Sequence, residues 1–132
     1  NNILKILDEA MIGNVPEHIS YKEIFYLHWI NLLNFFINNE YEGKFISQYI
    51  NSPKITKALA DINDIKFNYH RDLLARGIKE KAIKQVEFDV VAFYMWATVK
   101  HLHYLHINNI VHLTDSYMNN IFEVFWDGIK AT

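Results

Sequence analysis

Two consecutive helical segments end the chain, Phe88 to Ile107 and Ile110 to Lys130, and both carry apolar residues on two sides. A helix that packs only against its own domain needs a single apolar stripe over about a third of its circumference. In the first segment one seam holds Phe88, Ala92, Met95, Val99, Leu102 and His106, and the other holds Val90, Phe93, Ala97, His101 and Tyr104. One seam can serve the domain core, so the other predicts a partner, most simply a second copy of the chain.

The second segment repeats the pattern. One seam holds Ile110, Thr114, Tyr117, Ile121 and Val124, and the other holds Val111, Met118, Phe122, Phe125 and Ile129. Pairing of the two segments with their symmetry mates would form a four-helix bundle with an isologous, largely apolar interface. We therefore predict an obligate homodimer with an interface built from Val90, Phe93, Ala97, His101, Tyr104, Tyr117, Ile121, Val124 and Phe125. The alternative is that both seams are buried within one monomer.

Length and charge restrict the class of protein. A chain of 132 residues has the size of one domain, so we expect a single domain over residues 1–132. The formal net charge is −2 and Lys and Arg form no long cluster, which disfavours nucleic-acid binding by these residues. Cysteine is absent, so the sequence offers no disulfide or thiolate nucleophile, consistent with a cytoplasmic location. The most apolar run is far shorter than the roughly twenty residues of a membrane-spanning helix, so no membrane association is expected.

Helical periodicity and its breaks predict an all-α bundle of about six helices. Ser20, followed by Glu23, forms a capping box for a helix over residues 21–38. The apolar period stops over residues 40–43, and a short helix over residues 44–50 follows. Ser52 and Pro53 begin a helix over residues 54–76, and Gly77 provides a left-handed C-terminal cap.

Three motifs, in their order along the chain, resemble the C-terminal half of TetR-type (tetracycline-repressor-like) transcriptional regulators. They are FISQYINSP at residues 45–53, LLARGIK at residues 73–79 and FWDGIK at residues 125–130. The resemblance covers essentially the whole chain, including Trp29. It implies a domain that dimerises through its last two helices and encloses an effector pocket. In that family an N-terminal helix-turn-helix domain binds the operator, so we expect this chain to be a fragment that lacks it, with DNA contacted only through the absent domain.

Aromatic and apolar residues from three predicted helices form the candidate effector pocket, with a few polar groups among them. These candidates are Trp29, Leu33, Phe36, Phe67, His70, Leu74, Met95, Trp96, Val99 and His103. For any single one of them ordinary core packing is the more common role, whereas for the group the resemblance implies a cavity. No cluster of Arg accompanies them, which favours a small apolar or amphipathic effector that is uncharged or weakly charged.

The sequence offers few signals for metal binding or catalysis. His103 and His106 share a helix face, but no third ligand accompanies them, so we expect no metal and no cofactor. A phosphate-binding glycine loop, a nucleophile elbow and paired carboxylates are all absent, so we expect no enzyme. A polar stripe along one helix face, which we interpret as solvated, consists of His28, Asn31, Asn34 and Asn38. The alternative is that its amides lie inside a pocket and offer hydrogen bonds to a ligand. The alternative function is a small helical enzyme or a carrier of lipid or another hydrophobic ligand, with no DNA-linked role.

Overall fold

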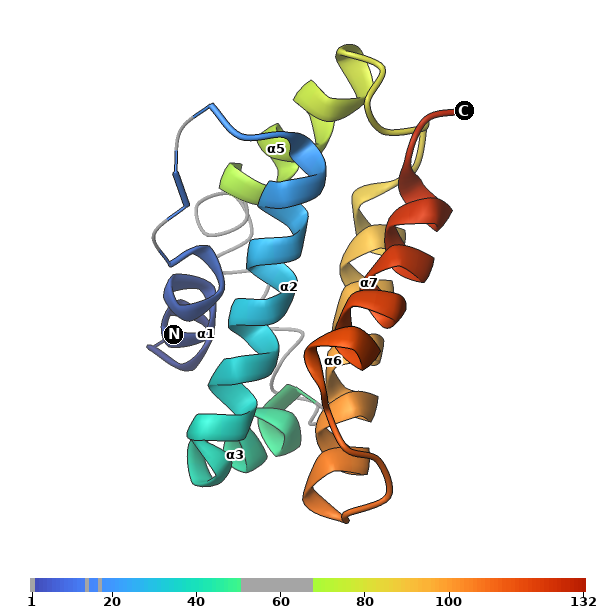
Figure 1. Ribbon diagram of the computed structural model, residues 1–132. Coiled ribbons are helices and arrows are strands. Elements are labelled where there is room, and N and C mark those ends of the chain that lie inside the picture. The colour runs from blue at the N-terminus through green and yellow to red at the C-terminus, as the bar shows by residue number, and fades with distance from the viewer. Residues whose placement is uncertain (1, 14, 17, 51–67) are drawn as a thin grey trace.

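The computed structural model describes residues 2–13, 15–16, 18–50 and 68–132 (Figure 1). In these ranges the chain forms six α-helices and no β-strand, which confirms the all-α prediction. The helices are α1 (Asn2–Ile12), α2 (Tyr21–Asn38), α3 (Glu40–Ile50), α5 (Asn68–Lys79), α6 (Phe88–Ile107) and α7 (Asp115–Ile129). The predicted helix start at residues 52–54 and the candidate Phe67 lie outside the described residues.

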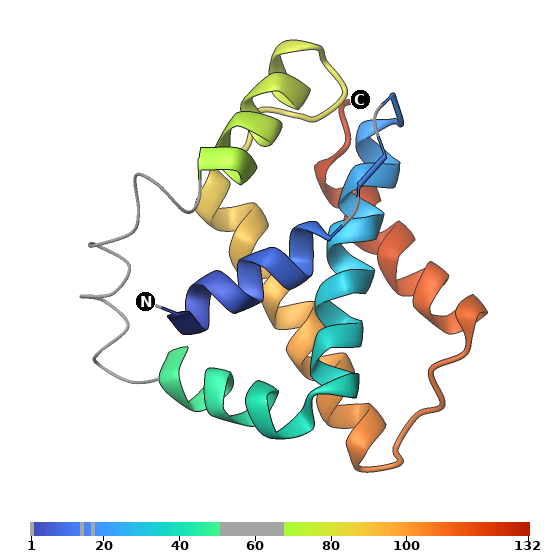
Figure 2. The same cartoon turned by 90° about the vertical axis from the view of Figure 1, so that its left-hand side faces the viewer.

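Helix α2 is the centre of the bundle, with α1 and α3 packed on one side and the α6–α7 pair on the other (Figures 1 and 2). It begins at the predicted capping box: the Glu23 backbone N–H donates to Ser20 Oγ at 3.1 Å. Its buried residues lie on more than one side, namely Phe25, His28, Trp29, Leu32, Leu33 and Phe36. A helix that is buried on more than one side supports the core of the whole domain.

Helix α3 begins at Glu40, directly after α2, so the predicted break over residues 40–43 is wrong. The turn is made instead by Asn39, whose φ and ψ of −131° and 60° leave the helical region. Gly43 is inside α3 and packs against the Phe36 ring, where an added Cβ would lie 2.5 Å from Cδ1. This glycine therefore permits close packing of α3 on α2 rather than ending a helix.

The predicted cap at Gly77 is also wrong, because α5 continues to Lys79. The left-handed residue after the helix is Lys81, with φ of 63°. Gly77 is buried against Ile83, whose Cδ1 would lie 2.4 Å from an added Cβ. Its carbonyl accepts hydrogen bonds from the backbone N–H groups of Ala82 and Ile83 at 2.9 and 3.1 Å. Gly77 thus allows the connection after α5 to fold back onto the helix.

Helix α6 has the predicted bounds, but α7 begins at Asp115 and not at Ile110. Thr114, predicted to be helical, is instead the N-cap, and its side chain accepts a hydrogen bond from the Tyr117 N–H at 3.1 Å. The end of the chain returns to the start of α6. There the Lys84 N–H donates to the Ile129 carbonyl at 2.9 Å, and the Ala131 N–H donates to the Ala82 carbonyl at 3.0 Å.

Candidate functional site

The two predicted seams of α6 lie in different environments. Met95, Val99 and Leu102 of the first seam are buried in the core. Every residue of the second seam is exposed, and Phe93 retains 73% of its accessible surface. The members of this second seam are Val90, Phe93, Ala97, His101 and Tyr104. We call them the outer face of α6; it is a row of apolar and aromatic side chains with His101 stacked on Tyr104.

Helix α7 contributes less to this surface than predicted. Val124 is 65% exposed, and Tyr117 and Ile121 are half-buried. Phe125 is only 1% exposed, because it packs against Phe122 and stacks on the Tyr94 ring within the same chain. The assignment of Phe125 to an interface is therefore corrected: its side chain belongs to the core of the monomer.

The described effector-pocket candidates form two groups that pack directly against their neighbours. On α2 and α6 five of them lie in the core, and the half-buried rings of Trp96 and His103 contact the Phe36 ring at centroid distances of 5.4 and 5.6 Å. The members of this group are Trp29, Leu33, Phe36, Met95, Trp96, Val99 and His103, which we call the α2–α6 seam. On α5, Leu74 is buried in the core, whereas His70 faces α1.

Two polar atoms of the α2–α6 seam are buried without a hydrogen-bond partner among the described residues, Trp29 Nε1 and His103 Nε2. Burial lowers the pKa of His103, and the nearby Glu40 carboxylate opposes this shift, so the ring is neutral near pH 7. Buried polar groups in folded proteins are nearly always hydrogen-bonded. The two orphaned atoms therefore mark the seam as a place where a polar group of a ligand would be stabilised.

A second polar cluster joins α1, α2 and α5, and the sequence did not reveal it. His70 Nε2 lies 2.6 Å from Asp8 Oδ1, and both side chains are largely buried. His28 Nε2 lies 3.3 Å from the Tyr69 hydroxyl, and the His28 and His70 rings meet at 5.4 Å. Asn31 adds a further link, since its amide donates to the Met11 carbonyl at 3.2 Å. These contacts fix α1 onto the bundle.

His28 is 1% exposed, so the interpretation of its helix face as solvated is wrong at this residue. Burial lowers its pKa to about 4, and the neighbouring His70 acts in the same direction, while the Asp8 carboxylate opposes the shift. His28 is therefore neutral at physiological pH, and its Nε2 accepts a hydrogen bond from the Tyr69 hydroxyl or donates one to it, according to the tautomer. The partner that allows its burial lies far along the chain, on α5.

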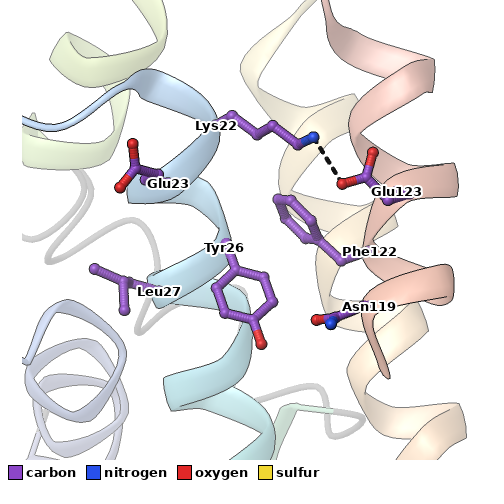
Figure 3. A pocket seen from close by; sticks show the side chains of 7 residues that line it. All are labelled: Lys22, Glu23, Tyr26, Leu27, Asn119, Phe122 and Glu123. Atoms are coloured by element: carbon purple, nitrogen blue, oxygen red, sulfur yellow. Dashed lines mark ion pairs between the residues drawn. The ribbon is translucent and has the colours of Figure 1, made fainter. Parts of the chain in front are cut away.

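A surface cleft of about 520 Å³ lies between α2 and α7 (Figure 3). Tyr26 and Phe122 line it with aromatic rings in edge-to-face contact at 5.1 Å. Figure 3 shows Lys22 reaching from α2 across one end of the cleft to Glu123 on α7, where Nζ and Oε1 are 2.7 Å apart. Glu23, Leu27 and Asn119 complete the lining, which contains none of the predicted site residues.

The structure also bears on metal and membrane binding. Within residues 2–13, 15–16, 18–50 and 68–132, no group of three or more His, Asp or Glu side chains is arranged to hold a metal ion. None of the helices in the described ranges has the length and apolar character needed to cross a bilayer.

The structure is thus a helical bundle with an exposed apolar face on α6 and a largely apolar seam between α2 and α6, and this class of all-α domain is found in known proteins. The family of tetracyclin repressor-like C-terminal domains matches residues 20–130. The chain belongs to this family. Its members are transcriptional regulators that typically dimerise and bind DNA and small effectors, and they are generally not enzymes.

Solved structures show the same fold. A TetR family protein from Vibrio parahaemolyticus matches with a TM-score of 0.80 at 21% identity, over 99% of this chain and 71% of that one. A TetR family protein from Shewanella sp. PV-4 matches with a TM-score of 0.82 at 13% sequence identity, over 99% of this chain and 71% of that one. A TetR family transcription regulator from Marinobacter aquaeolei VT8 matches with a TM-score of 0.82 at 16% sequence identity, over 99% of this chain and 69% of that one. Comparison with curated proteins gave no match.

Proposed function

We propose that residues 1–132 are the ligand-sensing and dimerisation domain of a TetR-like transcriptional regulator. The observation that carries the proposal is the outer face of α6, whose five residues are all exposed although three of them are valine, phenylalanine and tyrosine. A contiguous apolar surface of this kind marks an interaction site in a soluble protein. A second copy of the same face, related by two-fold symmetry, would cover it in a bundle of four helices.

The effector is assigned to the α2–α6 seam. Its apolar lining suits a small apolar or amphipathic molecule, and the Trp29 indole N–H and His103 Nε2 offer the polar contacts that fix its orientation. Because these side chains are packed together, binding requires α2 and α6 to separate. The ligand therefore selects a minor arrangement of the helices, and its differential affinity sets the size of the shift.

We assign the movement that follows effector binding to α1. DNA contact is assigned to a part of the regulator outside residues 1–132. Helix α1 is attached to α2 and α5 by the Asn31 and Asp8–His70 contacts, so movement of α2 on ligand binding displaces it. In a dimer, displacement of both copies of α1 changes the distance between the two DNA-binding parts. Effector and DNA then influence each other's affinity by the same factor.

Sedimentation equilibrium tests the dimer, and native mass spectrometry of the same sample tests for a co-purified effector. We expect a dimer at micromolar concentration that carries a small molecule or binds one from a panel of apolar and amphipathic compounds. A chain that stays monomeric at high micromolar concentration would refute the dimerisation role. With a bound compound in hand, Trp29→Phe removes the indole N–H, and we expect a loss of affinity of about tenfold. Trp126→Phe is the matched control, because Trp126 packs on Phe25 outside the seam.

A further inference from the structure

The cleft between α2 and α7 is distinct from both sites of the proposed function. Its lining shares no residue with the α2–α6 seam or with the outer face of α6. Its volume, about 520 Å³, falls within the range of small-molecule pockets in proteins. The cleft combines an apolar floor with charged groups at the rim, which is the arrangement that holds and orients a ligand.

Aromatic rings form the floor. The half-buried Tyr26 ring is the aromatic surface that a ligand can reach, because Phe122, which meets it edge to face, is only 2% exposed. The buried Trp29 ring lies behind both, with its centroid 6.4 Å from Tyr26 and 5.9 Å from Phe122. The negative face of an aromatic ring attracts a cation, and most strongly where water is partly excluded. The floor therefore favours a ligand that has an apolar body and carries positive charge.

The charged side chains of the rim favour the same ligand. At the rim Glu123 contributes a carboxylate and Lys22 an ammonium, whereas the Glu23 carboxylate points away from α7 (Figure 3) and accepts a hydrogen bond from Ser20 Oγ at 3.0 Å. A ligand carboxylate placed beside Glu123 would meet a like charge. A ligand ammonium would find an acceptor already arranged for it, because Lys22 Nζ sits 2.7 Å from Glu123 Oε1. The chain's own alkylammonium group occupies the position that an external one would take.

We propose that this cleft binds a small organic cation, an ammonium compound with an aromatic or aliphatic body, and that its ammonium displaces Lys22 from Glu123. The displacement costs little, because the two side chains are 42% and 49% exposed and such surface ion pairs contribute little to stability. Asn119 and the Tyr26 hydroxyl lie farther along the cleft (Figure 3) and are available to polar substituents of the ligand. Lys22 thus acts as an internal competitor for the site.

An NMR titration of the whole chain with two probes of opposite charge tests the inference. The probes are 3-phenylpropylamine and 3-phenylpropanoate, which have similar size and share an aromatic body. We expect saturable shifts with the amine at the Asn119 side-chain amide and the Glu123 backbone N–H, both of which belong to the cleft, and none with the carboxylate. Equal binding of both probes, or amine-induced shifts confined to residues outside the cleft, would overturn the proposal.

Substitutions of Glu123 and Lys22 test the role of each member of the ion pair in amine binding. Glu123→Gln should weaken amine binding about tenfold, since a charged acceptor is lost. Lys22→Met keeps the side-chain stem and removes the competing ammonium, so it should tighten amine binding about threefold. Asp127→Asn is the matched control on α7, because Asp127 pairs with Lys130 outside the cleft and its loss should leave the affinity unchanged. Weaker binding after Lys22→Met, or unchanged binding after Glu123→Gln, would exclude the site.

Discussion

Replacement of Phe93 by alanine tests the dimer at its most exposed aromatic side chain on the outer face of α6. Phe93 is 73% exposed in the single chain, and the proposed interface would bury it. Complete burial of a phenylalanine side chain contributes about 1.5–3 kcal/mol, so the exposed share corresponds to about 1–2 kcal/mol per protomer. The interface contains two copies, which gives about 2–4 kcal/mol per dimer. The dissociation constant should therefore rise between about 30-fold and about 1,000-fold.

Sedimentation velocity over a dilution series measures this change. Tyr41→Ala is the matched control, because Tyr41 is an aromatic residue that is 82% exposed on α3, outside the proposed interface. It should leave the dissociation constant unchanged, and neither substitution should alter the helical content of the chain. Equal dissociation constants for the Phe93 variant and the unmodified protein would refute the reasoning, since the outer face of α6 would then not be the surface buried on association.

Four further predictions concern the stability of the folded chain. Gly43→Ala should destabilise it by about 1–3 kcal/mol in urea unfolding, because the new Cβ would lie 2.5 Å from Phe36 Cδ1. Gly128→Ala, with nothing within 4 Å of its Cβ, should stabilise α7 by about 0.5–1 kcal/mol. The pKa of His28 is lowered from 6.5 to about 4, because the folded chain holds the neutral ring. Its contribution to the free energy of unfolding is therefore complete above pH 6.5 and is lost as the pH falls toward 4. The loss should reach about 2 kcal/mol at pH 5, and His28→Gln should flatten this slope in the pH dependence of urea unfolding. Ser20→Ala should cost about 1 kcal/mol by removing the cap of α2, whereas Lys84→Ala should leave thermal unfolding nearly unchanged.

Periodicity alone separated the two sides of α6. Helical geometry fixes which residues share a face, so the seam of Met95, Val99 and Leu102 and the seam around Phe93 could be assigned without knowing the fold. The structure buries Met95, Val99 and Leu102 and exposes the second seam, but Ala92 of the first seam is exposed and Phe88 and His106 are half-buried. On α7 the period groups Phe125 with Phe122 and Ile129, and the structure buries all three. The error was to add Phe125 to an interface made otherwise from the other seam of that helix. The identity of the partner of the outer face stays a prediction.

Residues whose role depends on distant contacts could not be predicted. Local rules predicted helix breaks at Gly43 and Gly77, yet both residues lie inside helices. Glycine is needed there because the side chains of Phe36 and Ile83 approach the helix backbone closely. His28 belongs to a polar series along α2, and its burial requires the Tyr69 hydroxyl, 41 residues away in sequence. The Lys22–Glu123 pair across the cleft joins residues from opposite ends of the chain. Such pairings follow from the packing of the helices and leave no local pattern.

The hydrogen bonds between the end of the chain and the segment before α6 have a mechanical consequence. Residues 82–84 lead into α6 and residues 129–131 leave α7, and the two bonds at 2.9 and 3.0 Å hold these segments together. The two helices are thus joined at both ends, by the covalent connection at one and by these bonds at the other. Sliding or rotating one helix against the other would break them. Under the proposed mechanism, a displacement of α6 on effector binding would therefore carry α7 with it, and in a dimer the two helices would change their crossing angle to those of the partner together.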